Sequence, residues 1–120
     1  MHHPLALALL LAIALPAPAW ALEGRYEGEA TFVVGTRHCP MQGPTLNFEV
    51  HADGKVVGGV KNAAKPLSFS GTLGPDGKLT TSYKLAESET VAIEATVTGE
   101  QLEGFAQQAS CKYKLSFQRQ

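Results

Sequence analysis

Apolar and polar residues alternate with a period of two along most of the chain after residue 22, and no stretch shows helical periodicity. In Arg25–Val34, for example, the even positions are Tyr, Gly, Ala, Phe and Val, whereas the odd positions are mostly charged. Such alternation puts apolar side chains on one face of a strand. The pattern predicts eight strands, at residues 25–34, 45–51, 55–61, 67–73, 79–85, 90–98, 102–107 and 111–118.

Short turn motifs join these segments in pairs. Asp53-Gly54 and Asp76-Gly77 are Asp-Gly pairs between alternating runs, which is the strongest short-range hairpin signal, and Gly99-Glu100 joins the next pair. Asp76 follows Asp53 by 23 positions, and Gly99 follows Asp76 by another 23. This regular spacing predicts an antiparallel meander with tight turns at one end and longer loops at the other, the longest being Val34–Pro44.

An open sheet of eight such strands would leave its apolar face and two edges exposed, whereas closure into a barrel hides both. We therefore expect an all-β fold, an eight-stranded antiparallel up-and-down (meander) β-barrel with one disulfide. A two-sheet β-sandwich is the alternative, because the same alternation serves that design too. The expected barrel interior contains the inward aromatic residues Tyr26, Phe32, Phe48, Phe69, Tyr83, Tyr113 and Phe117.

The N-terminal segment has the layout of a secretory signal peptide. The first 21 residues carry no Asp, Glu, Lys or Arg, and Leu5–Leu15 is an unbroken apolar run that ends before the A-x-A site Ala19-Trp20-Ala21. The run is shorter than the about 20 residues that a membrane span needs. We expect residues 1–21 to be a cleaved signal peptide and residues 22–120 to be a single β-barrel domain, periplasmic or secreted, with no membrane association after cleavage.

An exported protein enters an oxidising compartment, so Cys39 and Cys111 are candidates for a disulfide. The first strand runs toward the long-loop end and the last strand starts there, so both cysteines fall at that end. Closure makes these two strands neighbours. We predict a Cys39–Cys111 bond that seals the seam of the barrel and holds the long loop against the rim.

Composition and motifs limit the possible functions. Ten basic and eleven acidic residues give a net charge of −1, which excludes an electrostatic nucleic-acid binder. No catalytic motif is present, and His51 lies on an outward face near a turn, so we expect no enzymatic activity and no cofactor. His38, Cys39 and Met41 could form a soft metal cluster. The disulfide would remove Cys39 as a ligand, so we expect no metal site.

Three positions carry a resemblance to a known superfamily. Gly24-Arg25-Tyr26 is a Gly-x-aromatic motif at the start of the first strand, and Arg119 ends the last. With the meander, these residues resemble the calycin superfamily, specifically a lipocalin-like small secreted bacterial β-barrel. In lipocalins a Gly-x-Trp packs against a basic residue from the last strand at the closed end. The resemblance implies that Tyr26 and Arg119 meet there, with Tyr replacing Trp in a short chain that lacks the C-terminal helix.

The chain also resembles small periplasmic eight-stranded barrels that inhibit lysozymes or metalloproteases. It departs from them at Ser70-Gly71, where the Tyr that the lysozyme-inhibitor motif places three residues after the Ser is missing. The resemblance therefore assigns no functional residue.

An eight-stranded barrel is either filled by its own side chains or holds one small ligand. Gly28, Gly71 and Gly104, on or near inward positions, would leave space and favour a cavity. The tyrosine hydroxyls could contact a ligand or could instead bond backbone carbonyls. We expect an exported non-enzymatic binding module, a lipocalin-like barrel that holds a small apolar ligand.

The alternative function is a protein-binding inhibitor or envelope accessory protein, which would use the rim loops against an envelope or secreted protein and keep a filled core. An internal void of roughly 300 Å³ or more would favour the small ligand over the protein partner. In both cases the functional residues would ring the long-loop end, namely Thr36, Arg37, His38, Met41, Lys65, Gln107 and Gln108.

Overall fold

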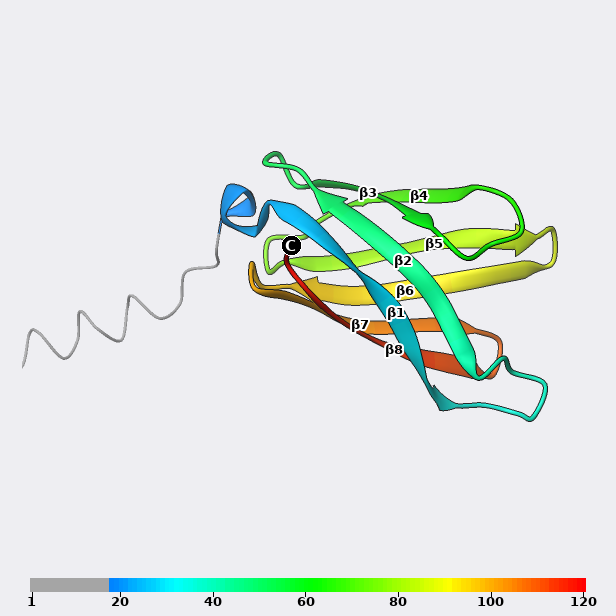
Figure 1. Ribbon diagram of the computed structural model, residues 1–120. Helices are drawn as coiled ribbons and strands as arrows, with labels where there is room; N and C mark the ends of the chain where they lie inside the picture. The colour runs from blue at the N-terminus through cyan, green and yellow to red at the C-terminus, as the bar shows by residue number, and fades with distance from the viewer. Residues whose placement is uncertain (1–17) are drawn as a thin grey trace, which may run out of the picture.

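The computed structural model describes residues 18–120, which form eight antiparallel strands in a nearly closed β-barrel (Figure 1). A single sheet contains these strands in the order β4-β3-β2-β1-β8-β7-β6-β5, so the predicted up-and-down barrel is confirmed over the sandwich. The strands are β1 Gly24–Val34, β2 Gln42–Val50, β3 Lys55–Val60, β4 Leu67–Thr72, β5 Lys78–Ala86, β6 Glu89–Val97, β7 Gln101–Gln108 and β8 Cys111–Gln118.

A short 3-10 helix, η1 (Ala19–Leu22), precedes the barrel and crosses the predicted cleavage point. Leu22 is buried against the tight-turn end, and its carbonyl accepts a hydrogen bond of 3.0 Å from the Tyr26 hydroxyl. Residues 1–17 of the predicted signal peptide lie outside the described residues. Within residues 18–120, no helix combines the length and apolar character that crossing a membrane requires.

The first strand pairs with the last, as predicted. In the β1–β8 ladder Thr31 lies opposite Lys114 and Phe32 lies opposite Tyr113. Nearer the tight-turn end, Tyr26 forms an isolated bridge with Arg119, the residue that follows β8. Closure therefore depends on contacts between the two ends of the sequence.

The gap in the sheet lies instead between β4 and β5, two strands that are consecutive in the chain. In the described chain these strands share no backbone ladder. Side chains bridge them: the Thr81 hydroxyl donates to the Ser70 carbonyl at 2.6 Å, and the Phe69 ring stacks on Tyr83 with 5.8 Å between centroids. The disulfide lies where it was predicted, on the side where β1 and β8 meet, whereas the gap between β4 and β5 was not predicted.

The predicted tight turns form, and they gather at the end of the barrel that also carries η1 and the C-terminus (Figure 1). Gly54, Gly77 and Gly99 adopt φ angles of +91°, +80° and +94°, which glycine tolerates without steric cost. Asp53 and Asp76 each accept a hydrogen bond through Oδ1 from the backbone N–H two residues later, at 3.0 and 3.3 Å. These side-chain bonds explain why an Asp precedes the glycine.

Strand β2 begins at Gln42, inside the segment Val34–Pro44 that the sequence predicts to be a loop. A β-bulge makes the longer strand possible, because Gly43 and Pro44 together lie opposite Ala30 of β1. A proline is acceptable at a bulge, where its missing N–H breaks no regular pairing. The long loop is therefore shorter than predicted, and β2 reaches the rim.

Side chains fill the barrel interior. Among the aromatic residues predicted to point inward, Phe32 is half-buried and the others are at most 6% exposed. Six of them form two groups of ring contacts: Phe32 contacts Tyr113, and Phe48 contacts both Phe117 and Phe69, which in turn contacts Tyr83. Aliphatic residues of every strand complete the core.

The glycines expected to create a cavity do not leave one. A Cβ on Gly28 would come within 2.6 Å of the Phe117 ring, and one on Gly71 would come within 2.8 Å of Leu79. At Gly104, a Cβ would overlap the backbone of the neighbouring strand β6. Neighbouring protein atoms therefore occupy the space beside these glycines and leave none for a ligand. The expectation that the glycines enlarge the interior is wrong.

Candidate functional site at the long-loop rim

The predicted disulfide holds the long loop to the barrel. Cys39, in the β1–β2 connection, is bonded to Cys111, the first residue of β8, with 5.6 Å between their Cα atoms. The Cys39 N–H donates to the Thr36 carbonyl at 3.0 Å and closes a turn. Gly35 packs against the sulfur so closely that a Cβ there would come within 2.5 Å of Cys39 Sγ. The disulfide, the turn and this close packing therefore hold the loop against the start of β8.

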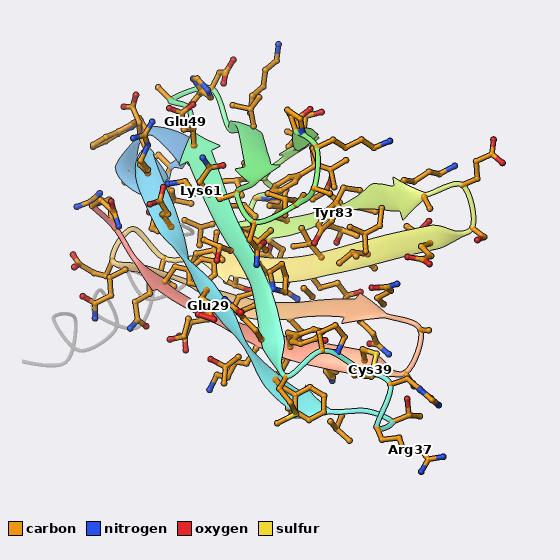
Figure 2. All side chains as sticks on the ribbon, turned by 45° about the vertical axis from the view of Figure 1, so that its right-hand side comes forward. Glu29, Arg37, Cys39, Glu49, Lys61 and Tyr83 are labelled. Atoms are coloured by element: carbon orange, nitrogen blue, oxygen red, sulfur yellow. A yellow bond between two sulfur atoms is a disulfide. The ribbon has the colours of Figure 1, made fainter. Side chains whose placement is uncertain are left out.

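The predicted rim residues lie at the surface of the long-loop end. Figure 2 shows Arg37 pointing away from the body of the barrel, on the same loop as Cys39. Gln108 is half-buried, and the exposed members of the set are Thr36, Arg37, His38, Met41, Lys65 and Gln107.

Exposed apolar side chains also collect at this end. Met41 is 75% exposed, and Val33 and Val34 at the end of β1 are 49% and 56% exposed. The alternation pattern predicts an inward Val34, but a register shift between Phe32 and Val34 in the β1–β8 ladder turns it outward. We refer to Val33, Val34 and Met41 as the rim apolar residues.

A pocket of about 150 Å³ opens beneath the rim, where the start of β2 faces the loop-side ends of β5, β6 and β8. This volume is half of the roughly 300 Å³ at which a drug-sized ligand pocket begins. An apolar cavity of roughly 150 Å³ can hold one benzene ring. The wall contains no charged residue and consists of Pro40, Gln42, Gly43, Pro44, Asn62, Tyr83, Leu85, Val91, Gln108 and Tyr113.

Two polar side chains of the wall serve to hold the rim together. Asn62 Oδ1 accepts a hydrogen bond from the Thr45 N–H at 3.0 Å, and its Nδ2 donates to the Gly43 carbonyl at 3.3 Å. The Tyr113 hydroxyl donates to the Pro40 carbonyl at 2.7 Å. The Asn62 bonds tie the β3–β4 connection to the start of β2, and the Tyr113 bond ties the disulfide loop to β8, so both residues are committed to structure.

The hydroxyl of Tyr83 has no such role. Tyr83 is only 5% exposed, yet its hydroxyl forms no hydrogen bond with any residue in the range 18–120. Among the described residues every fully buried side-chain N or O atom has a partner, so this hydroxyl must reach accessible space, and Tyr83 lines the pocket. Burial, with a smaller contribution from Tyr113, raises the pKa of Tyr83 to about 12. The group is therefore a neutral hydrogen-bond donor at physiological pH.

The sequence pattern predicts Tyr83, Tyr113 and Gln108 as site residues but not the rest of the wall. Asn62 carried a signal, because a loop asparagine between strands often bonds nearby backbone. Leu85 and Val91 follow the alternation but look like ordinary core residues. Nothing in the sequence indicates that the core stops short of the rim at these positions.

The other chemistry considered in the sequence is not assembled. The disulfide removes Cys39 from the possible ligand set of His38, Cys39 and Met41. Across residues 18–120, no group of three or more His, Cys, Asp or Glu side chains is placed to hold a metal ion. The exposed His51 follows β2 next to a tight turn, away from the pocket wall.

The tight-turn end of the barrel has the arrangement that the lipocalin resemblance implies. Tyr26 is completely buried there beside Arg119, whose guanidinium donates to the Glu23 carbonyl at 3.4 Å. Gly24 makes room for this side chain, since a Cβ at that position would come within 2.6 Å of Arg119 Cδ. The nearly closed antiparallel barrel is compatible with a lipocalin-like fold. Comparisons with protein-family models, with curated proteins and with solved structures gave no significant match.

Proposed function

We propose that this protein is an exported, non-enzymatic binding protein that contacts a partner protein through the rim of its barrel. The observation that carries the proposal is the contrast between a filled interior and the rim apolar residues, which remain exposed beside a disulfide-held loop. Exposed apolar side chains that gather on an ordered surface are typical of interaction sites. A loop fixed in advance loses little conformational entropy on binding.

The chemistry of the rim supports a protein as the partner. Met and Arg are enriched at the centres of protein interfaces, and the loop presents Met41 and Arg37 a few residues apart. The disulfide supports a periplasmic or secreted location, because such bonds persist in oxidising compartments. On this proposal residues 1–21 direct export, and the likeness at the closed end reflects membership of the calycin superfamily.

Binding of a small ligand is the second candidate function, and the rim pocket is the observation that favours it. Its volume of about 150 Å³ suits a group of one ring rather than a long lipid chain. The two functions can share this end of the barrel, since the pocket opens beneath the loop that carries the rim apolar residues.

Site-specific photocrosslinking in the native host tests the protein partner. A benzophenone amino acid at Met41 should give one discrete crosslinked product. The matched control places the same group at Val57, which is also an exposed apolar residue (41%) but lies on the barrel wall in β3. The double variant Cys39→Ser, Cys111→Ser should lose the Met41 product because its loop is released.

A product from Met41 that also forms from Val57, or persists when the loop is released, would count against a specific rim interface. The absence of any product from Met41 would count against a protein partner altogether.

A further inference from the structure

The three tyrosines of the chain use their hydroxyls differently. Tyr26 donates to the Leu22 carbonyl at 3.0 Å and Tyr113 donates to the Pro40 carbonyl at 2.7 Å. Tyr83 is as buried as Tyr113, at 5% exposure, but its hydroxyl has no partner in residues 18–120 and borders the rim pocket. This hydroxyl reaches accessible space, so a group that excludes water from the pocket loses free energy unless it accepts the hydrogen bond itself.

The position of Tyr83 is set by the core and not by its hydroxyl. Its ring stacks on Phe69 across the gap between β5 and β4, with an interplanar angle of 24°. This contact holds the ring whether or not the hydroxyl is bonded. The hydroxyl is therefore held ready at the pocket and needs no rearrangement to donate.

The remaining wall of the pocket limits what could accept this hydrogen bond. Leu85, Val91 and Pro44 supply an apolar surface, and no wall residue carries a formal charge. A charged group would lose hydration there without gaining an ion pair. A purely apolar group would leave the Tyr83 hydroxyl unpaired. The wall therefore suits an uncharged group that combines an apolar body with one polar atom.

We propose that the rim pocket binds one uncharged, ring-sized group whose polar atom accepts a hydrogen bond from the Tyr83 hydroxyl. A phenol belongs to this class. The same chemistry is offered by a free phenolic molecule and by a tyrosine side chain of a partner protein. The pocket is formed by this barrel alone, so the proposal for the pocket can be tested independently of the partner proposed above.

Titration of the purified, disulfide-bonded protein with p-cresol and toluene tests this site, because the two probes differ by one hydroxyl group. Backbone amide NMR signals of the pocket wall should shift with both probes. We expect p-cresol to bind about twofold to tenfold more tightly, the range of one neutral hydrogen bond. The charged analogue 4-methylbenzoate should not bind.

Two matched variants separate binding from folding. Tyr83→Phe should remove the preference for p-cresol while leaving the unfolding midpoint unchanged or higher, because the hydroxyl forms no bond within the described chain. Tyr26→Phe loses a hydrogen bond at the far end of the barrel, so it should lower the midpoint and keep the preference. Equal affinities of the wild-type protein for both probes, or a preference that survives in Tyr83→Phe, would overturn the proposal.

Saturating p-cresol distinguishes the two sources of the group. Loss of the Met41 crosslink in the presence of p-cresol would show that a side chain of the partner occupies the pocket. An unaffected crosslink would show that the pocket binds a free molecule instead. If p-cresol binds through Tyr83 but Met41 yields no crosslink at all, the partner proposal fails and the pocket remains.

Discussion

Burial controls the ionisation of the tyrosines. Desolvation raises the pKa of Tyr26 and Tyr113, and it raises that of Tyr83 furthest, to about 12. In the unfolded chain a tyrosine ionises near pH 10. The pKa of the buried tyrosine is higher in the folded protein than in the unfolded chain. Its contribution to the free energy of unfolding is therefore complete below pH 10 and is lost as the pH rises from about 10 toward about 12.

We therefore expect the free energy of unfolding to fall steeply between about pH 10 and pH 12. Tyrosinate absorbance near 295 nm should rise together with the loss of β-sheet circular dichroism. Tyr83→Phe removes the group with the largest shift and should make the fall less steep. Three phenolates that form in a native barrel below pH 10 would contradict the observed burial.

The Tyr26 hydroxyl should contribute measurably to stability. Tyr26→Phe leaves the buried Leu22 carbonyl without its donor and should lower the free energy of unfolding by about 1–3 kcal/mol in urea. Tyr83→Phe is the control of identical chemistry and should cause no loss. Equal destabilisation by the two variants would show that the Tyr83 hydroxyl has a structural partner.

At the scale of single residues, the alternation pattern correctly identifies the inward aromatic residues. The exception is Phe32, which is only half-buried. The pattern does not show which atoms the tyrosine hydroxyls bond. The partners of Tyr26 and Tyr113 are carbonyls of η1 and of the disulfide loop, whose positions depend on the assembled barrel. That the Tyr83 hydroxyl has no partner within residues 18–120 is therefore visible only in the structure.

At the scale of elements, the β1–β2 connection shows how a bulge extends a strand through a Gly-Pro pair. Gly43 lies so close to the backbone of β1 that a Cβ would overlap the Ala30 carbonyl. Together with Pro44 it forms the bulge that brings β2 to the pocket. The geometry of the pocket wall thus depends on a position where only glycine fits.

Gly43→Ala should destabilise the protein by about 1–3 kcal/mol, the usual cost of overpacking, because the clash is with backbone that cannot rotate away. Gly74→Ala is the control, since its Cβ would meet its nearest neighbours at 3.4 and 3.6 Å, which is ordinary van der Waals contact. Urea denaturation of both variants checks the difference. A Gly43→Ala variant as stable as the control would mean that the bulge is absent.

The strand pattern also predicts pairing that does not occur. Asp76-Gly77 is a strong hairpin signal, and its turn forms, but β4 and β5 do not pair in the described chain. Leu79 packs directly over Gly71, so a side chain occupies the space between the strands. Turn chemistry acts over a few residues, whereas strand pairing also depends on how the whole sheet curves. The location of the gap could not be inferred from local signals.

At the scale of the whole molecule, the disulfide connects the long loop to the final strand across 72 positions. In the chain-entropy model such a loop contributes about 4.4 kcal/mol. That is a large share of the ~5–15 kcal/mol net stability of a typical domain. Its position followed from topology, because an up-and-down barrel brings both cysteines to the same end.

Cys39→Ser should lower the melting temperature sharply, and reduction of the wild-type protein should have the same effect. Cys111→Ser is the control, because it removes the same bond from the other strand and should match Cys39→Ser. Thermal unfolding followed by circular dichroism measures the loss. Equal melting temperatures with and without reductant would show that the bond adds nothing to the stability of the barrel.

Whether the barrel was hollow could not be predicted from its sequence. A small inward residue such as Gly28 leaves room in a strand, but the ring of Phe117 from another strand enters that room. The volume left over depends on such contacts between distant residues. The rim pocket of about 150 Å³, where the start of β2 and the ends of β5 and β6 meet, is defined by such contacts as well.

The barrel is paired between β1 and β8 and unpaired between β4 and β5, and interstrand nuclear Overhauser effects between backbone protons test this arrangement directly. We predict cross-strand contacts between Phe32 and Tyr113, and no backbone ladder across the gap between β4 and β5. A continuous β4–β5 ladder, or the absence of contacts between β1 and β8, would contradict it.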